Sequence, residues 1–487
     1  MRSHERDGSD DSFASAGTIK LRTARGVLLG IAAAGISAPF AFGIVVLLSH
    51  VSAEAVGYYG LLTIVLGMSG LIAAGGPAVA ARFGPGVGPL PNAVTYLQSV
   101  LAPIFAGGIG AIVAALVPLP GALSPLYVAV LLSLGVIWLA RQGELNAGLR
   151  FGDTQIVQAI PTLFQFVVLG LAFVVVPSVL KASNREIVFG TYAVPLGLIA
   201  TWHVMHLWRK RHRDDRIFTM PPGIWRYIVG MEGVLVLSTI FISAERYVAL
   251  ATGNGLKTLG IYVAIYQLAE LIRRIPNLVA SALVPAFSLL ETTGGAEEYH
   301  DSSAGPVALL GFLLGTTISM LAPWLIGLYG SEIHKGSLAL SVLALAFGAT
   351  AVASLDMAYA QAKDRLRLYN AGLLLGLVMF LPLTVIVASV TAFALARAGA
   401  VSVQQLVLVS RLPHVRVARL EHMCLTLLIG GAELALRMVG GDIATLAPLW
   451  WLVGIVIYWK LLGHPQPRVL VARIILAARG HVTSNMT

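Results

Sequence analysis

The sequence predicts an all-α polytopic membrane protein with about fourteen transmembrane helices, arranged as two pseudo-symmetric six-helix bundles plus a C-terminal helix pair. Three observations predict this fold. Of the 487 residues, 57% are hydrophobic and 11% are charged, whereas a soluble domain carries about 25% charged residues. The apolar residues form repeated runs of about 20, the length at which a helix crosses a bilayer. Short sequence words also recur between the two halves of the chain.

Each expected span is one apolar run bounded by short polar or basic stretches. No loop between the runs is long enough to fold as a domain of its own. Taken in order, and with ends placed to within a few residues, the expected spans are 26–48, 58–80, 94–117, 124–140, 156–178, 187–207, 224–244, 259–288, 306–328, 337–359, 369–392, 399–412, 421–438 and 446–462.

The polar stretches divide the chain into segments. The first 25 residues are polar and mixed in charge, and they lack the basic–apolar–small pattern of a cleaved signal peptide. The expected segments are a disordered cytoplasmic tail (1–25), an N-terminal six-helix bundle (26–210), a basic cytoplasmic linker (211–223), a C-terminal six-helix bundle (224–412), an extra helix pair (413–462) and a cytoplasmic tail (463–487).

The basic residues predict the orientation in the membrane. If residue 1 is inside the cell, the inside loops carry most of the Lys and Arg, and the outside loops carry few, namely Lys181, Arg185, Lys257 and Lys335. An even number of spans with both termini cytoplasmic follows. Because the net charge of +10 is spread over short loops, we expect no nucleic-acid partner. The single cysteine, Cys424, excludes an intramolecular disulfide and a cysteine zinc cluster.

An internal repeat relates the two halves. The sequence S-A-E-A-V-G-Y-Y-G-L-L follows the first span, and G-L-K-T-L-G-I-Y-V-A-I-Y follows the seventh. Gly57 and Tyr59 match Gly260 and Tyr262, and each pair opens a span on the outer side. Six spans per repeat, both starting inside, predict parallel halves related by an axis along the membrane normal. Two such halves with a polar seam are typical of a transporter that works by alternating access.

Three charged residues lie deep within the expected span 259–288, namely Glu270, Arg273 and Arg274. Each charge at bilayer depth costs roughly 2.5–3.5 kcal/mol on the insertion scale. Glu270 is spaced i,i+3 and i,i+4 from the arginines, so all three can share one helix face. This group therefore predicts a protein-lined interior that holds water or a ligand.

Five sequence words carry a resemblance to a known family. They are S-A-E-A-V-G-Y-Y-G-L-L-T-I (52–64), A-E-R-Y-V (244–248), L-G-I-Y-V-A-I-Y-Q-L-A-E-L-I-R-R-I-P (259–276), A-L-V-P-A-F (282–287) and A-R-A-G-A-V-S-V (396–403). The chain resembles the polysaccharide flippases of the multidrug/oligosaccharidyl-lipid/polysaccharide exporter (MOP) superfamily. The resemblance covers the first twelve spans. Glu245-Arg246 stands where the family usually has Asp-Arg.

The resemblance implies a transporter in the bacterial inner (plasma) membrane. It would flip a polyprenyl-pyrophosphate-linked saccharide from the cytoplasmic to the periplasmic leaflet by alternating access, for surface or exopolysaccharide biosynthesis. The expected partners are this lipid-linked saccharide, the surrounding membrane lipids, and a polysaccharide polymerase with its export machinery. Arginine suits a pyrophosphate because its planar fork donates two hydrogen bonds at once. We expect no enzymatic activity, no cofactor and no metal.

The charged residues in and near the expected spans are the candidate site residues. Substrate binding is assigned to Arg273, Arg274 and Arg246, ion coupling or counter-charge to Glu270, Glu245 and Glu232, and a cytoplasmic gate to Arg141 and Glu144.

Each assignment has a structural alternative. Glu270 could pair with the two arginines to stabilise a kink before Pro276, and Glu245-Arg246 could cap a helix end at the interface. Glu232 could pair with another helix, and Arg141 could extend to water from the membrane interface. For Asp356, at the inner end of its span, a solvated interfacial position is the favoured interpretation.

Two rival functions remain open. A drug or metabolite antiporter of the same superfamily shares the first twelve spans. A membrane polysaccharide polymerase or ligase shares the hydrophobicity, although we expect such an enzyme to carry a large outer loop with catalytic residues. No nucleotide-binding motif is present in the sequence, so the energy is expected from an ion gradient or from removal of the product outside.

Overall fold

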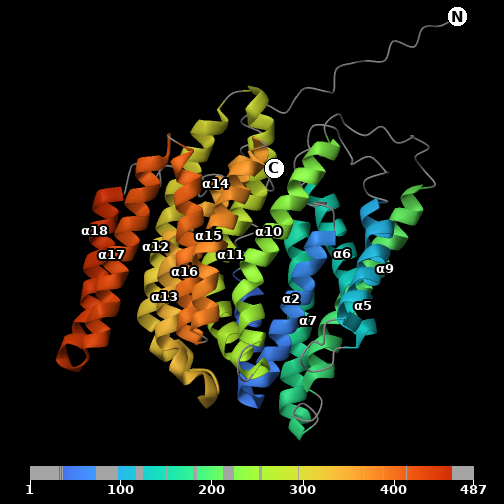
Figure 1. Ribbon diagram of the computed structural model, residues 1–487, viewed down its shortest axis with the longest axis horizontal. Coiled ribbons are helices and arrows are strands. Elements are labelled where there is room, and N and C mark those ends of the chain that lie inside the picture. Colours follow the sequence, from blue (N-terminus) through green and yellow to red (C-terminus); the bar gives the residue numbers. More distant parts are fainter. Residues whose placement is uncertain are drawn as a thin grey trace, which may run out of the picture.

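The computed structural model describes residues 32, 35, 37–72, 97–116, 124–147, 151–178, 184–211, 224–251, 255–293, 295–363, 365–387, 389–412 and 414–462. Within these ranges the chain is almost entirely helical, as the sequence predicts. The helices stand side by side in one elongated assembly (Figure 1).

The first half of the chain, residues 37–211, forms one bundle. It begins with the apolar helix Ser37–Val51. The elements that follow are α2 (Ala53–Ile72), the π-helical turn η1 (Leu97–Leu101), α5 (Ala102–Leu116), α6 (Pro125–Ala147), α7 (Phe151–Val175) and α9 (Asn184–Arg211).

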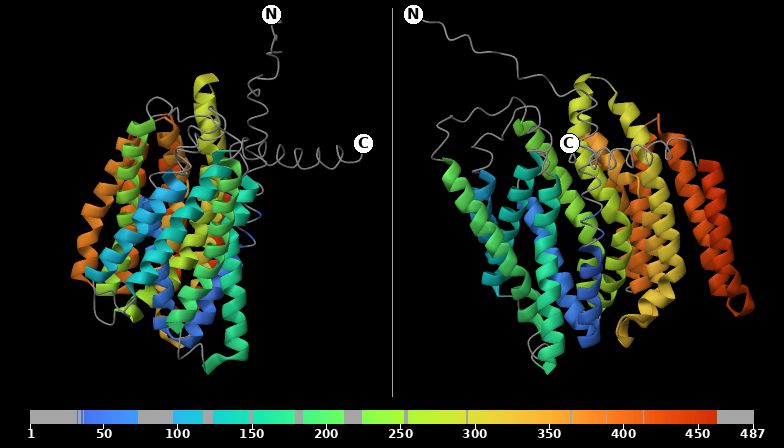
Figure 2. Two further views of the ribbon diagram at one scale, coloured as in Figure 1. Left: turned by 90° about the vertical axis from the view of Figure 1, so that its right-hand side faces the viewer. Right: turned by 180° about the vertical axis from the view of Figure 1, so that it is seen from behind.

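The second half, residues 224–410, forms the other bundle, and an additional helix pair follows it. The elements of the second half are α10 (Ile224–Ala251), α11 (Leu256–Thr293), α12 (Ala296–Gly327), the 3-10 helix η2 (Ser331–Gly336), α13 (Ser337–Ala349), α14 (Ala353–Ala362), α15 (Leu366–Ile386) and α16 (Val390–Ser410). The pair consists of α17 (Arg416–Val439) and α18 (Ala447–Leu462), joined by the 3-10 helix η3 (Gly441–Leu446). In Figure 1 and in the right-hand view of Figure 2, α17 and α18 lie at the outer edge of the second half.

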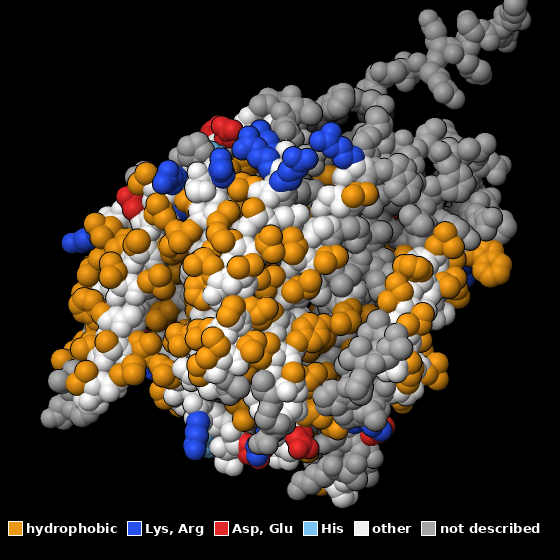
Figure 3. Space-filling view, in the orientation of Figure 1, with side chains coloured by type: hydrophobic (Ala, Val, Ile, Leu, Met, Phe, Trp, Pro, Cys, Tyr) orange, Lys and Arg blue, Asp and Glu red, His pale blue; other side chains and the backbone are white. Residues whose placement is uncertain are grey.

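The described helices confirm a multi-pass membrane protein. Eight of them are long and apolar enough to cross a membrane by length and composition, or nine if the bent pair α13–α14 counts as one span. The described parts of the other expected spans also fall on helices: Ser37–Val51, α2, α5, α10 and α11. Most of residues 26–36, together with 73–80, 94–96 and 117 of these spans, lies outside the described residues, as do the expected tails 1–25 and 463–487 and the linker from residue 212 to 223. Large apolar side chains are exposed on the flanks, as a lipid-facing surface requires (Figure 3).

Two of the expected spans differ from the helices in the structure, one because it is broken and one because it begins earlier. The expected span 337–359 is broken into α13 and α14, which are bent by 43°. Thr350 lies at the break, and its hydroxyl donates to the Ala346 carbonyl at 2.8 Å, a back-bond that often bends helices. The expected span 399–412 begins earlier, at Val390, so α16 includes Arg397.

The two ends of the assembly differ in charge. We call one end the basic end: it carries the α9 C-terminus and the connections α14–α15 and α16–α17, with the exposed side chains of Arg209, Arg365, Arg367, Arg411 and Arg416. Figure 3 shows Lys and Arg side chains gathered along this edge. The opposite end, with the start of α11 and with η2, is called the far end.

Helices α2 and α11 join the two halves. They are the helices that open with the repeated words, and the matched glycines lie where they cross. A Cβ atom on Gly57 would overlap the carbonyl oxygen of Leu256, and a Cβ on Gly260 would overlap that of Ala53. Glycine therefore permits the two backbones to touch at the far end, in the way that small residues permit close packing of membrane helices.

Polar contacts add to this junction at the far end. The Ala53 amide donates to Glu332 Oε2 at 3.0 Å, and Lys257 forms an ion pair with the same carboxylate. The amide of Gly330 donates to Ser49 Oγ at 3.1 Å. The bonds of Ala53 and Ser49 tie the first half to η2 and its N-cap Gly330, and the Lys257–Glu332 pair holds η2 to α11 within the second half.

The helix pair α17–α18 packs against α12 and α13. Glu433 and Arg437 form an ion pair within α17, and Ser319 of α12 donates to Glu433 at 3.1 Å. Arg437 donates to Ser341 of α13 at 3.0 Å. Inside an apolar bundle these bonds fix how the pair is placed, because an unsatisfied charge there would be costly.

Candidate functional site

The charged residues of α10 and α16 form a buried ion pair. Arg397 Nη2 lies 2.6 Å from Glu245 Oε2, and the side chains are 0% and 5% exposed. Arg397 also donates to the Phe241 carbonyl, and its guanidinium lies 4.8 Å from the centre of the Phe241 ring. The structure thus places Glu245 as the counter-charge of an arginine within the same half.

Arg397 is the site residue that the sequence prediction missed. The expected span began at residue 399, so Arg397 was counted as part of a loop. A signal for the true start was available: Ser389 is the N-cap of α16, and its hydroxyl accepts from the Ala392 amide at 3.1 Å. A serine before a run of helix-forming residues is a recognised start signal.

Arg246 lies between the two halves. Its guanidinium stacks 4.5 Å from the centre of the Tyr266 ring of α11, and its Nη1 donates to Thr63 Oγ1 of α2 at 3.1 Å. The side chain is buried, and both its Nε and the Tyr266 hydroxyl lack a hydrogen-bond partner. Arg246 is therefore not an exposed helix cap. Its Nε–H and the Tyr266 O–H are hydrogen-bond donors that no described residue uses.

Arg273 and Arg274 are adjacent near the middle of α11 and have different surroundings. The Arg273 guanidinium lies 5.2 Å from the centre of the Phe347 ring of α13, in the second half. Arg274 lies within electrostatic reach of the Tyr59 and Tyr192 hydroxyls of the first half. The assignment of both arginines to one substrate site stays a prediction.

The structure describes the side chain of Glu270 but not that of Glu232. Glu270 is half-buried one turn before the arginines, and among the described residues no ion pair joins it to Arg273 or Arg274. Glu232 lies in α10, but its side chain is outside the described part of the structure.

Arg141 and Glu144 bring together α6 and α9 within the first half. They form an ion pair, and the Arg141 guanidinium lies 4.4 Å from the centre of the Trp202 ring. Glu144 also lies 3.7 Å from His203 Nδ1. Arg141 is buried, so it does not extend to water, and these contacts stay inside one bundle.

Asp356 is fully buried, which corrects the expected solvated position. Its carboxylate accepts from Arg419 at 3.1 Å, from Gln405 at 3.0 Å and from His300 at 3.0 Å. These partners come from α17, α16 and α12, and none is near Asp356 in the sequence. The spacing of these residues along the sequence therefore could not predict the buried hydrogen-bond network around Asp356.

The region around α11 carries more positive than negative side chains. It combines four arginines, at 246, 273, 274 and 397, with two glutamates, at 245 and 270, and with tyrosine hydroxyls. Because Glu245 neutralises Arg397, the remaining guanidinium groups lack a carboxylate partner among the described residues. Their donors suit phosphate or pyrophosphate oxygens.

No protein-family model and no curated protein matches the sequence. Solved structures of membrane transporters do share its fold. An outward-facing multidrug resistance MATE family transporter of the MOP superfamily matches with a TM-score of 0.55 at 13% identity, over 86% of this chain and 96% of that chain. An inward-facing structure of such a transporter matches with a TM-score of 0.55 at 13% identity, over 83% and 98%.

A third structure is a MOP superfamily transporter from Pyrococcus furiosus, in which a reverse polarity of the binding pocket suggests a different function. It matches with a TM-score of 0.53 at 14% identity, over 86% of this chain and 96% of that chain. At such identities the likeness concerns the fold alone. The chain has the two-bundle fold of MATE family transporters of the MOP superfamily.

Proposed function

We propose that the protein is a membrane transporter that flips a polyprenyl-pyrophosphate-linked saccharide between leaflets by alternating access, for surface or exopolysaccharide biosynthesis. The observation that carries the proposal is the group of arginines on α10 and α11, where the two halves meet. Arg246 donates to Thr63 of the first half, Arg273 lies against Phe347 of the second, and Arg274 lies within electrostatic reach of Tyr59 of the first.

The charges at this position favour an anionic cargo. Each uncompensated charge at bilayer depth costs roughly 2.5–3.5 kcal/mol, and these three guanidinium groups have no carboxylate partner among the described residues. A pyrophosphate would supply the missing negative charge and accept hydrogen bonds from more than one arginine. The apolar polyprenyl tail would stay in the lipid while the polar head passes between the halves.

The contacts at the far end support an alternating-access cycle. The crossing of α2 and α11, together with the bonds of Ser49, Ala53 and Glu332, closes the far end. With the basic end in the cytoplasm, as the positive-inside rule favours, this is the state that would load cargo from the cytoplasm. We place the protein in the bacterial inner membrane, with both termini cytoplasmic and with the polysaccharide polymerase and export machinery as partners.

A drug or metabolite antiporter is the second candidate. The matched structures of multidrug resistance MATE transporters favour it, because they share the fold over most of their length. A polymerase or ligase is less favoured, because the connections at the far end are short: residues 328–336 join α12 to α13, and residues 387–389 join α15 to α16.

Lipid analysis of a strain that lacks the protein tests the proposal. Lipids are extracted, and polyprenyl-pyrophosphate saccharides are identified by mass. Their leaflet is then determined with a membrane-impermeant reagent. We expect a single unpolymerised unit to accumulate on the cytoplasmic face. Accumulation on the outer face would instead indicate a polymerase or ligase. Intact surface polysaccharide with no accumulation would favour the antiporter.

A further inference from the structure

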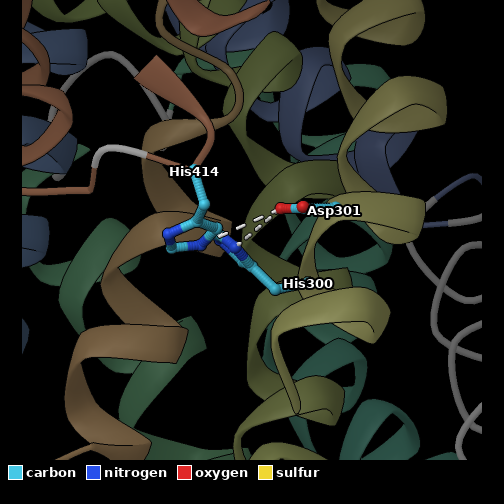
Figure 4. Close-up of side chains that lie close together, drawn as sticks. All are labelled: His300, Asp301 and His414. Atoms are coloured by element: carbon cyan, nitrogen blue, oxygen red, sulfur yellow. Dashed lines mark ion pairs between the residues drawn. The ribbon is translucent and has the colours of Figure 1, made fainter. Parts of the chain in front are cut away.

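Three side chains at the basic end converge in a way that the proposed transport does not use. His300 and Asp301 lie in the second turn of α12, and His414 lies in the connection between α16 and α17 (Figure 4). Asp301 Oδ1 is 3.7 Å from His300 Nδ1 and 3.9 Å from His414 Nε2. One nitrogen or oxygen atom from each residue lies within 4.8 Å of the others.

The contacts of His300 determine which of its two ring nitrogens carries the proton and which carries the free lone pair. Its Nε2 lies 3.0 Å from Asp356 Oδ1, and the same carboxylate accepts from Arg419 and Gln405. Because Asp356 acts as an acceptor, we assign the proton of the neutral imidazole to Nε2. The lone pair is then on Nδ1, the atom that faces Asp301.

His300 Nδ1 has no hydrogen-bond partner, although the side chain is fully buried. Buried polar atoms without a partner are rare and call for an explanation. A histidine that donates one ring N–H to a carboxylate and presents the other nitrogen is the arrangement found for metal-binding histidines. The ring is also held in place by Tyr359, which stacks on it at 4.5 Å between centres.

We propose that His300 Nδ1, Asp301 Oδ1 and His414 Nε2 bind one Zn²⁺ ion at the basic end. In a tetrahedral zinc site with bonds of about 2.0–2.1 Å, neighbouring ligand atoms are about 3.3 Å apart. The two separations from Asp301 Oδ1, 3.7 and 3.9 Å, are about 0.4–0.6 Å longer than this, and the two histidine nitrogens, within 4.8 Å of each other, must also approach. Asp301 is 43% exposed and His414 is 25% exposed, so both side chains have room to move.

The ligand types favour zinc over the other common divalent ions. Two imidazoles and one carboxylate suit a transition metal, whereas Mg²⁺ and Ca²⁺ prefer oxygen ligands throughout. Because Asp301 and His414 are partly exposed, a water molecule completes the coordination from the aqueous side. The bound ion would link α12 to the α16–α17 connection and so brace the helix pair α17–α18 against the second half.

Zinc titration of the full-length protein tests the proposal. The protein is purified in detergent with an affinity tag that contains no histidine, stripped with a chelator, and titrated with zinc chloride against a chromophoric chelator. We expect one high-affinity Zn²⁺ per chain. Asp301→Ala and His414→Ala should each weaken binding more than about tenfold, since even the loss of a supporting second partner costs 10–100-fold.

Two matched variants serve as controls. Glu298→Ala removes an exposed carboxylate one turn earlier on α12, and His50→Ala removes an exposed histidine at the far end. Both should bind zinc as the wild type does. X-ray absorption at the zinc edge should show imidazole scattering that weakens in His414→Ala. The proposal is overturned if the wild type binds no zinc, or if Asp301→Ala and His414→Ala bind it as tightly as the controls.

Discussion

Arg397 shows how a charge is kept inside the bundle. Its side chain is fully buried, and Glu245 neutralises it at 2.6 Å. Removing one partner of a buried ion pair typically costs about 3–5 kcal/mol, because the other charge is left unpaired. Replacing both partners by uncharged groups of similar size is often neutral. Glu245 is thus better explained as a counter-charge than as an ion-coupling residue.

This explanation predicts a rescue between two substitutions. Arg397→Met alone should destabilise the protein by about 3–5 kcal/mol, because Glu245 remains buried without its partner. Adding Glu245→Gln should restore most of the lost stability. Thermal unfolding in detergent measures both effects. A double variant that is less stable than Arg397→Met would contradict the counter-charge role.

Arg273 and Arg274 are expected to act on the cargo rather than on folding. Neither forms an ion pair with a described residue, so Arg273→Ala with Arg274→Ala should leave the protein inserted and folded. Complementation of the deletion strain should fall to about a tenth or less, because each lost charge-assisted hydrogen bond is worth about 1.5–3 kcal/mol.

The single variants and a control refine this prediction. Because each side chain supplies its own guanidinium to the cargo, each single variant should retain part of the activity. Arg367→Ala removes an exposed arginine at the start of α15 and should complement fully. Full complementation by the double variant would remove the head-group role from both residues.

Among the helices, the close crossing of α2 and α11 depends on Gly57 and Gly260, because glycine has no side chain to keep the two backbones apart. Gly260→Ala places a methyl group against the carbonyl of Ala53, so the helices must separate at a cost of about 1–3 kcal/mol. Gly67→Ala is the matched control in α2, since nothing lies within 4 Å of its added methyl group. It should be neutral or stabilising, because alanine favours helix by about 1 kcal/mol over glycine.

Thermal unfolding in detergent distinguishes the two variants by the sign of the change. Equal stability of Gly260→Ala and Gly67→Ala would contradict the close crossing. The repeat in the sequence had matched Gly57 with Gly260, but it could not reveal that the matched residues meet the opposite helix.

The sequence predicted the helices well because the bilayer imposes a length and a composition on each span. It predicted side-chain partners poorly, because apolar runs do not record which face of a helix meets which neighbour. Arg397 was missed through a span boundary, and Asp356 was misjudged because its partners are His300, Gln405 and Arg419 from other helices. The zinc ligands were missed for the same reason, since His414 is remote in sequence from His300.

At the scale of the whole molecule, the two halves are tied together at the far end. A transporter that alternates must break the contacts of Ala53 with Glu332 and of Ser49 with Gly330 in each cycle. Holding this end closed should therefore stop transport without unfolding the protein.

A reversible cross-link tests this requirement. In a Cys424→Ser background, Ala53→Cys with Glu332→Cys is treated with a short thiol-specific bifunctional reagent that contains a disulfide. We expect transport in cells to stop on cross-linking and to return on reduction, and the single-cysteine variants to be unaffected by the reagent. Undiminished transport by fully cross-linked protein would exclude opening at the far end.

Flipping by the purified protein is the decisive measurement of the proposed transport. The protein is reconstituted into liposomes with a labelled polyprenyl-pyrophosphate saccharide, and exposure of the label to a membrane-impermeant reagent is followed over time. We expect rapid flipping by the wild type. For the Arg273→Ala, Arg274→Ala double variant we expect flipping no faster than in protein-free liposomes. Wild-type flipping at the protein-free rate, or equal rates for wild type and double variant, would contradict the proposed transport.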